Sequence, residues 1–356
     1  MKYLFIVQGE GRGHMTQAMS LERMLMDRGH EVVEIMVGIS PSRKVPDFFL
    51  KGVKAPISYF EGINFTPSAD NRKPSMLKSV LMNTFNFHKY MPSIQHVCDK
   101  IRSSGADCVV NFYDLIGGLA YFFHEIEVPM VCIGHQYLFL HKDFGLPRDQ
   151  YPDSIALDFY THMTSIKAVK HLALSFRPMP DDPKRKIVTV PPLLRPEVLQ
   201  IEPTRGDYIH GYMLNSGFAE DVMKWHKEHP EVELRFFWDN WEAGKVKKID
   251  DTLSFYTIDD KEFLRQMAGC MAYASTAGFE SVCEAIYMGK PILMVPSHIE
   301  QEINAFDASR CGAGVYDDRF DLTLLLEFSR IYEVNHDFRA WVKSAPEIIC
   351  RELEKM

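Results

Sequence analysis

Residues 2–29 read KYLFIVQGEGRGHMTQAMSLERMLMDRG, and they show the order of secondary structure that the rest of the chain repeats. The apolar run Lys2–Val7 has the length of a buried strand. After a glycine-rich turn, Met15–Arg28 repeats apolar residues at helical spacing and stops at Gly29, a residue type that commonly follows a helix. A strand followed directly by a helix predicts the repeating unit of a parallel α/β sheet.

The same alternation continues along the chain. Strands are expected at 31–37, 57–60, 107–112, 129–133, 171–176, 187–190, 208–214, 233–238, 253–257, 271–274 and 291–295. Helices are expected at about 75–103, 116–126, 154–170, 218–229, 260–268, 279–288 and 300–310, with two more after 322. The pattern predicts an α/β protein with two Rossmann-like, parallel-sheet domains that face each other across a cleft.

The domain boundary is predicted from the proline-rich stretch PPLLRPEVLQIEP at 191–203. A chain of 356 residues exceeds the size at which single hydrophobic cores stop growing, so two domains are expected. Four prolines cannot continue a helix or a central strand, which favours an extended linker. The expected organisation is a first domain at 1–190, a linker at 191–206, a second domain at 207–335 and a C-terminal helix at 336–356. Packing of that helix back on the first domain is left open.

Composition narrows the classes of function. The formal net charge of −8 makes nucleic acid an unexpected partner. Seven widely spaced cysteines without a CxxC pair argue against a disulfide framework and against a zinc site. The chain has no apolar run long enough to span a membrane, and its first residues do not resemble a signal peptide. We therefore expect a cytoplasmic protein, with contact at the inner face of a membrane as an alternative.

The loop Gly9-Glu-Gly-Arg-Gly13-His14 joins the first strand to the first helix, at the edge of the sheet where α/β proteins bind ligands. Its spacing does not match the GxGxxG fingerprint of dinucleotide-binding proteins. His14 can carry a proton near neutral pH, which makes it a candidate general base, with Gly11 and Gly13 as candidate ligand contacts. The alternative is that the glycines form only a tight turn.

Residues 274–305 read ASTAGFESVCEAIYMGKPILMVPSHIEQEINA and carry the strongest signal in the chain. A small-residue loop runs into a helix whose first amide groups and positive dipole suit a phosphate. Glu284, one to two turns into that helix, can accept both hydroxyls of a ribose. The remaining candidate donor contacts are polar side chains and glycines of the two ligand-facing segments: Ser275, Thr276, Gly278, Ser281, Glu300, Gln301 and Asn304.

This segment resembles the donor-binding signature of GT-B glycosyltransferases, especially the UDP-glycosyltransferases and the undecaprenyl-linked N-acetylglucosaminyltransferase of peptidoglycan synthesis. The matching residues are Thr276–Glu284, Gly289-Lys290-Pro291, Pro296, Glu300-Gln301 and Asn304-Ala305. Two positions depart from the family pattern. Thr276 stands where the family has a phosphate-contacting histidine, and Glu280 is an acid beside the expected diphosphate.

The resemblance implies an inverting transfer of a sugar from a nucleotide-sugar donor, UDP-linked by analogy, to an acceptor hydroxyl. The leaving diphosphate would be stabilised by the Gly278–Ser281 helix start and by the Asn215-Ser216-Gly217 loop. The chain contains no DxD triplet, so neither a metal nor another cofactor is expected. The acceptor is a glycan, a lipid-linked sugar or a small molecule, which would place the enzyme in cell-surface glycan or glycolipid synthesis.

Two residues of the first domain complete the expected site. Asp114 follows a strand at the same sheet edge as His14, so it is expected to orient the imidazole, the alternative being a buried helix cap. His135 also follows a strand and is a candidate acceptor contact. Residues 43–54, RKVPDFFLKGVK, are expected to form a surface loop, with contact to a lipid-linked acceptor or a membrane as the alternative.

Two other functions remain open at this stage. A nucleotide-sugar 2-epimerase can share the two-domain fold, although the chain lacks the GTRPE-like and DSGG-like loops expected of that family. A non-catalytic nucleotide-sugar-binding protein would keep the donor motif without using His14. The sequence names neither the sugar nor the oligomeric state.

Overall fold

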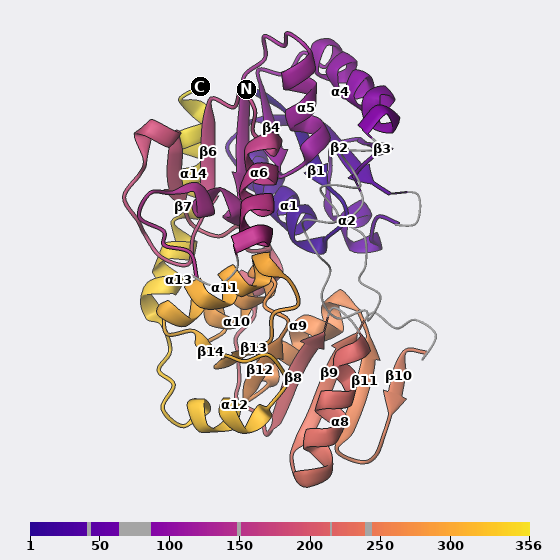
Figure 1. Ribbon diagram of the computed structural model, residues 1–356, viewed down its shortest axis with the longest axis vertical. Helices are drawn as coiled ribbons and strands as arrows, with labels where there is room; N and C mark the ends of the chain where they lie inside the picture. The colour runs from indigo at the N-terminus through magenta and orange to yellow at the C-terminus, as the bar shows by residue number, and fades with distance from the viewer. Residues whose placement is uncertain (41–43, 64–86, 148–150, 214–215, 239–243) are drawn as a thin grey trace. The chain divides into compact units, whose positions relative to one another are not determined.

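The computed structural model describes residues 1–40, 44–63, 87–147, 151–213, 216–238 and 244–356. The chain divides into two compact units (Figure 1). The first contains the described residues up to Arg195 together with Trp341–Met356, and the second contains Pro196–Ala340. Each unit is described by itself below.

The first unit contains a seven-stranded parallel sheet with the strand order β3-β2-β1-β4-β5-β6-β7. Its strands are β1 Lys2–Gln8, β2 Glu31–Ile39, β3 Ile57–Glu61, β4 Cys108–Phe112, β5 Met130–Gly134, β6 Lys170–Leu174 and β7 Ile187–Val190. The central strands β4 and β5 are buried throughout. Apart from Asn111, their apolar sequences reflect helices on both faces of the sheet.

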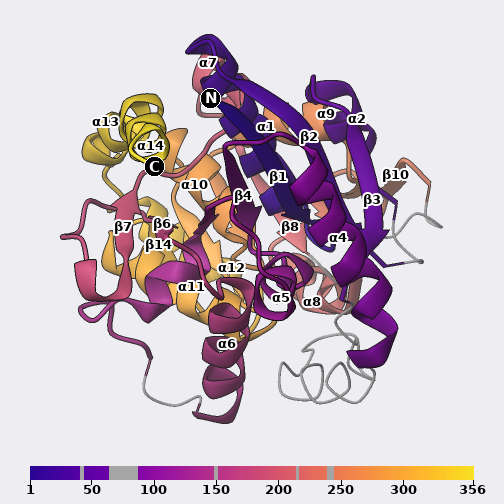
Figure 2. The same cartoon turned by 90° about the horizontal axis from the view of Figure 1, so that it is seen from above.

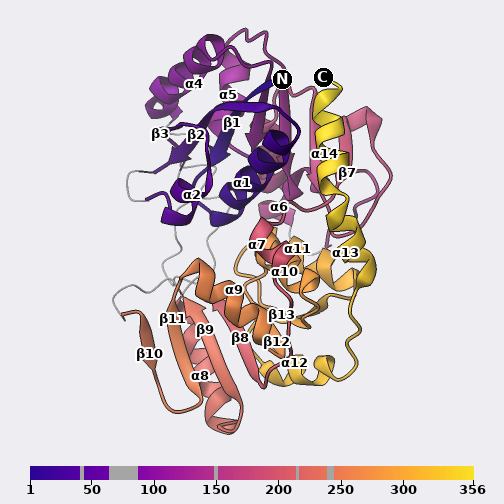
Figure 3. The ribbon, with the colours of Figure 1, turned by 180° about the vertical axis from the view of Figure 1, so that it is seen from behind.

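Helices cover both faces of this sheet. They are α1 Arg12–Asp27, α2 Asp47–Gly52, α4 Met91–Ser103, α5 Leu115–Phe123, α6 Tyr151–Thr164 and α14 Ala345–Glu354, with short 3-10 segments at Phe87–Tyr90, His135–Leu140 and Pro183–Arg185. Helix α5 lies between α4 and α6 (Figure 2). Helices α1 and α14 lie on the opposite face from α5 and α6 (Figures 1 and 3).

The C-terminal residues end in the first unit as helix α14, which packs against α1 and β7 (Figure 3). The Lys170 ammonium pairs with the Glu352 carboxylate at 3.2 Å, and the His30 ring with Glu354 at 2.9 Å. A single helix was expected over 336–356. The structure instead breaks it into α13 His336–Lys343 and α14, because Pro346 at the second position of α14 cannot donate a backbone hydrogen bond to a continuous helix.

The second unit repeats the architecture with the strand order β10-β11-β9-β8-β12-β13-β14. The strands are β8 Tyr208–Met213, β9 Glu233–Trp238, β10 Val246–Lys248, β11 Leu253–Thr257, β12 Ala272–Ser275, β13 Ile292–Met294 and β14 Gly314–Tyr316. All neighbours are parallel except the edge strand β10, which runs antiparallel to β11. The α/β fold class with two such sheets is therefore confirmed.

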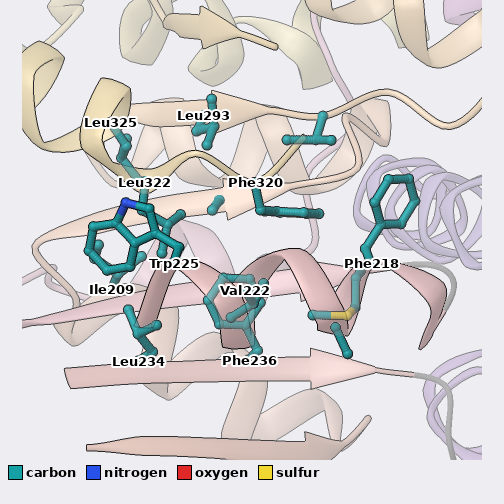
Figure 4. Close-up of a cluster of buried hydrophobic side chains, with 14 of the residues drawn as sticks. Ile209, Phe218, Val222, Trp225, Leu234, Phe236, Leu293, Phe320, Leu322 and Leu325 are labelled. Carbon is teal, nitrogen blue, oxygen red and sulfur yellow. The ribbon is translucent and has the colours of Figure 1, made fainter. Parts of the chain in front are cut away.

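The helices of the second unit are α7 Pro196–Gln200, α8 Ala219–Glu228, α9 Asp260–Gly269, α10 Phe279–Tyr287, α11 Ile299–Arg310 and α12 Leu322–Ser329, with a 3-10 turn at Ser216–Phe218. A hydrophobic cluster from α8, β8, β9, β13 and α12 fixes one face of the sheet (Figure 4). Trp225 packs in this cluster and donates its indole N–H to the Thr323 hydroxyl at 2.9 Å.

The expectation of a wholly extended segment over 191–206 is wrong, because Pro196–Gln200 forms α7 with Val198 fully buried. Proline suits the first position of a helix, where its missing N–H has no partner to lose. Sequence periodicity also missed α2 and the short edge strands β10 and β14. The expected helix at 75–103 is observed as α4, and its first part lies outside the described residues.

In both units the strand order reverses beside the first strand of the unit. The β1–α1 and β4–α5 loops therefore flank one reversal, and the segment after β8 and the β12–α10 loop flank the other. Ligands of open α/β sheets bind at this position, outside the carboxyl ends of the strands. The two predicted motifs lie in these loops.

Candidate active site

The β1–α1 loop contains one glycine that the fold requires. A Cβ on Gly9 would lie 2.5 Å from Ile39 Cγ2 and 2.7 Å from the Gly38 carbonyl oxygen, which already accepts the Gly9 N–H at 2.8 Å. Gly11 is exposed, with nothing within 4 Å of the position a Cβ would take. Gly9 therefore serves the turn, whereas Gly11 leaves open space in front of the helix start.

Helix α1 begins without a capping side chain. Its N-cap is Gly11, no side chain accepts a hydrogen bond from its first turn, and that turn contains Gly13 and no acidic residue. The unpaired amides and the positive dipole at such a start can receive an anionic or hydroxyl-bearing ligand.

His14 lies in the first turn of α1 with only 8% of its surface exposed. Its Nδ1 is 3.3 Å from Gln17 Oε1, and its ring stacks on Tyr113 with centroids 5.7 Å apart and planes at 27°. With the Gln17 oxygen as acceptor, Nδ1 carries the hydrogen and Nε2 holds the lone pair. Burial lowers the pKa of His14 from 6.5 to about 4, so the imidazole is neutral at pH 7.

Asp114 does not hold His14, which corrects the sequence-based expectation. The Asp114 carboxylate caps α5: its Oδ1 accepts the Gly117 N–H at 2.9 Å, and its Oδ2 would lie 2.5 Å from a Cβ on Gly38. The structure shows no hydrogen bond between His14 and Asp114, both of which are described. Burial raises the pKa of Asp114 to about 6, against the opposing effect of the helix amides. The capping alternative is the one observed.

His135 is a core residue, and the expectation that it contacts the acceptor is not supported. Its side chain is 1% exposed, and its Nδ1 lies 2.7 Å from the Leu174 carbonyl oxygen. The rings of Phe139, Phe144 and Phe176 meet it edge-on. A residue that follows a strand is expected near the ligand edge, but the His135 side chain is buried among these aromatic rings instead.

In the second unit, the β12–α10 loop has a fixed and unusual backbone. Ala277 adopts φ +61°, in the left-handed region that alanine rarely occupies. The Ser275 hydroxyl accepts the Ala277 N–H at 3.2 Å, and the Asn304 amide on α11 donates to the Ala277 carbonyl at 3.1 Å. Gly278 is the N-cap of α10 and has no capping side chain. These contacts fix the backbone of the loop that leads into α10.

Buried polar atoms beside this helix start lack hydrogen-bond partners in the described structure. They include the Thr276 hydroxyl and Asn304 Oδ1, each on a fully buried residue. Burying a polar group without a partner costs free energy, so such atoms at a helix start indicate a ligand that supplies the missing bonds. The Ser281 hydroxyl donates to the Gly278 carbonyl at 3.1 Å and lies 3.5 Å from Ser275 Oγ.

Three further predicted donor contacts lie on α10 and α11. Glu284 is buried on α10, and Glu300 is partly buried in the first turn of α11. Gln301 is committed locally, because its Oε1 accepts the Ser297 N–H at 2.9 Å and the Ser297 hydroxyl at 2.7 Å. Gln301 therefore shapes the turn before α11 and has only its NH₂ group left to offer a sugar.

The other candidates lie at the edges of the donor motif. Asn215 is outside the described residues, whereas the backbone of Ser216 and Gly217 forms the 3-10 turn after β8. Glu280 is half-buried in the first turn of α10. Among the described residues, no group of three or more His, Cys, Asp or Glu could hold a metal ion. In the same part of the chain, none of the helices has the length and apolarity to cross a membrane.

The family model described as glycosyl transferase family 1 matches residues 1–331. The chain belongs to this family. It is a glycosyltransferase, and binding of a nucleotide-sugar donor is typical of the family. The resemblance found from the sequence motifs is confirmed. No curated protein matches the chain in sequence.

Solved glycosyltransferases share the fold of this family member at low sequence identity. The glycosyltransferase of kitacinnamycin covers 99% of this chain and 98% of its own at 13% identity, with a TM-score of 0.64. UGT2 of Phytolacca americana, solved with UDP-2-fluoro-glucose and pterostilbene, covers 99% of both chains at 12% identity and the same TM-score. The spinosyn rhamnosyltransferase SpnG matches at 14% identity over 99% and 100%, with a TM-score of 0.62. These likenesses establish the GT-B fold.

Sequence reasoning missed one residue that contacts the candidate site and one that braces the second sheet at its opposite, amino-terminal edge. Tyr113, in the β4–α5 loop, contacts His14. Nothing in the sequence around Tyr113 predicts its left-handed backbone. Lys290, in the Gly-Lys-Pro turn, has its ammonium buried against the carbonyl oxygens of Thr204 at 2.5 Å and Cys270 at 2.7 Å. Burial lowers the pKa of Lys290, and the side chain ties the start of β12 to the segment before β8. A lysine between apolar segments was the available signal.

Proposed function

We propose that the chain is an inverting, metal-independent glycosyltransferase that moves a hexose-type group from a UDP-linked donor to an acceptor hydroxyl. The observation that carries the donor assignment is the uncapped start of α10, with the unpaired Thr276 hydroxyl and Asn304 oxygen buried beside it. These groups and the helix amides suit a diphosphate, whereas Glu284 suits the ribose hydroxyls.

In the proposed reaction, His14 Nε2 takes the proton of the acceptor hydroxyl. The acceptor oxygen then forms a bond to the anomeric carbon, and the bond from that carbon to the diphosphate oxygen breaks. The negative charge that develops on the diphosphate is stabilised by the α10 amides and the neighbouring hydroxyls. Gln17 keeps the proton on Nδ1, which leaves the lone pair of Nε2 for the reaction.

The replacement of the family histidine by Thr276 fits this scheme. A threonine hydroxyl is a neutral donor that can bond a phosphate oxygen without adding charge. Glu280 contributes a negative charge at the same helix start, which opposes the anion. We expect this acid to weaken donor affinity, so that the buried donors of the loop carry the binding.

The test separates donor binding from chemistry. Calorimetric titration with UDP should show at least a tenfold loss in Glu284→Ala, because a hydrogen bond to a charged group contributes about 1.5–3 kcal/mol. Glu347→Ala, on the exposed surface of α14, is the matched control and should bind UDP like the wild type. Unchanged affinity in folded Glu284→Ala would exclude Glu284 from the site.

Turnover should then be followed with UDP-glucose, UDP-galactose and UDP-N-acetylglucosamine. Acceptors should include 4-methylumbelliferone, a methyl glycoside and an undecaprenyl-linked sugar. Acceptor-dependent release of UDP that survives EDTA supports the proposal. An isomerised sugar formed without acceptor would indicate an epimerase, and donor binding without any turnover would indicate a binding protein.

A further inference from the structure

Tyr113 has the most unusual backbone of the first unit's ligand edge. It follows β4 directly and adopts φ +59°, although its side chain is bulky and only 3% exposed. A non-glycine residue in this region clashes with its own carbonyl, and such strain persists only where surrounding contacts impose it. Ala277 occupies the equivalent place in the second unit, one residue before the N-cap of the helix after β12.

The Tyr113 side chain makes contacts that support this backbone conformation. The Tyr113 hydroxyl lies 2.6 Å from Thr161 Oγ1 on α6, which itself donates to the Leu157 carbonyl at 2.8 Å. Tyr113 is therefore the donor in the hydroxyl pair. The rings of Tyr137 and Tyr160 pack against the Tyr113 ring with centroids 5.6 Å and 5.5 Å away. The hydroxyl and these two rings fix the plane of the Tyr113 ring.

The ring fixed in this way is the one that His14 stacks on, with centroids 5.7 Å apart. Asp114, the neighbouring residue, is occupied as the cap of α5. We propose that Tyr113 is the positioning residue of His14: its left-handed backbone presents a flat, buried ring that sets the orientation of the imidazole. This inference rests on the proposed role of His14 as general base.

The charged groups around His14 are engaged elsewhere. Glu10 Oε1 accepts the Ser40 N–H at 2.8 Å, and the Arg12 guanidinium lies over the Phe48 ring at 5.3 Å. From α5, the Asp114 carboxylate faces the helix amides. The depressed pKa of His14 has burial as its main cause, so loss of the covering ring should raise it.

The direct test is the titration of His14 by NMR in protein labelled at histidine Cε1, with the signal assigned by its loss in His14→Ala. Tyr113→Phe keeps the ring and should leave the titration unchanged. Tyr113→Leu and Tyr113→Asn remove the ring, and His14 should then titrate at least about one pH unit higher, towards the ordinary value. Lys167→Asn is the matched control, since it changes another left-handed residue, at an exposed turn.

Turnover with the donor and acceptor pair identified above gives the second readout. In the two ring-removing variants kcat should fall by about 10- to 100-fold while UDP affinity stays the same, because orientation of the base affects only the chemical step. Tyr113→Phe should retain kcat within about threefold. A folded Tyr113→Leu that keeps both the wild-type His14 titration and wild-type kcat would overturn the proposal.

If neither ring-removing variant folds, Tyr160→Leu decides. It keeps the Tyr113 ring and its hydroxyl but removes one of the two rings that hold the Tyr113 ring in place. A displaced His14 signal supports the proposal, and an unchanged signal overturns it. Failure of the wider function is recognised separately: wild-type turnover in His14→Ala would remove His14 as base, while the NMR result would still report whether Tyr113 sets its environment.

Discussion

His14 shows how burial prepares a histidine for proton transfer. An ordinary histidine, with a pKa of about 6.5, is partly protonated near neutral pH. Burial lowers the pKa of His14 to about 4, so nearly every molecule holds the neutral form at pH 7. The lower pKa also makes the imidazole a weaker base, so the proposed transfer depends on close placement of the acceptor hydroxyl.

The low pKa of His14 predicts that kcat/KM is independent of pH over a wide range. kcat/KM should stay level from pH 8 to about pH 5 and fall as His14 becomes protonated near its pKa of about 4. His14→Ala should lower turnover by about 10²- to 10⁴-fold without changing UDP affinity. His162→Ala, an exposed histidine on α6, is the control. An acid limb near pH 6.5 would contradict a buried base.

Helix starts at the carboxyl edges of the two sheets differ in whether a side chain caps them. Helices α2, α4, α8, α11 and α14 also begin without a side-chain cap. The first turns of α5, α9 and α12 are capped by Asp114, Asp259 and Asp321, each of which accepts a backbone N–H. Helices α1 and α10 begin at Gly11 and Gly278 without such a cap. An internal cap satisfies amides that a ligand could otherwise use, so the uncapped starts are the ones available for binding.

Substitution of Asp114 tests whether that residue is a cap or part of the catalytic machinery. Asp114→Ala should lose about 0.5–2 kcal/mol of unfolding free energy, whereas Asp114→Asn should stay close to the wild type because asparagine caps equally well. Asp321→Ala is the matched control in the second unit and should lose a similar amount. Urea denaturation measures both. A large loss of turnover in a stable Asp114→Asn would restore a catalytic role for the carboxylate.

Across the whole molecule, buried histidines link folding to pH in both units. Burial lowers the pKa of His14 and His171 in the first unit to about 4, and of His210 and His298 in the second to about 3 and 4. The His210 ring nitrogens have no hydrogen-bond partner in the described structure, and Phe237, Phe263 and Tyr273 surround the ring. Below pH 6.5 these groups bind protons in the unfolded chain but not in the folded one.

Stability should therefore fall on acidification from pH 6.5 towards pH 4. In this window each such histidine changes the unfolding free energy by at most about 1.4 kcal/mol per pH unit. Asp114 and Asp317, whose pKa values burial raises (to about 6 for Asp114), have the opposite effect above their unfolded value, but they are two groups against four. Urea midpoints at pH 7 and pH 5 measure the difference.

His210→Phe should reduce the pH dependence of the unfolding free energy, since it removes a titrating group and places a phenylalanine among the surrounding aromatic rings. The exposed His162→Ala should not change it. Equal urea midpoints at the two pH values would contradict the burial of these histidines.

The sequence by itself determined the α/β class, the two sheets and the place of both motifs. Alternating apolar strands and amphipathic helices leave few other ways to bury their apolar faces, and short connections place the loops at the carboxyl edge of each sheet. The order of small, hydroxylated and acidic residues over 274–305 identified the donor motif and the family. These features are local, so periodicity and spacing are enough to read them.

Only the tertiary structure decided which side chains meet. Tyr113 and His14 are far apart in sequence, and their stacking depends on the pairing of β1 with β4. The same packing turned Asp114 into a helix cap and placed His135 in the core. Side-chain direction at the end of a strand depends on backbone torsion and on neighbours from distant segments, and a linear pattern carries neither. A sequence therefore identifies the loop that holds a site, whereas the fold selects the residues that complete it.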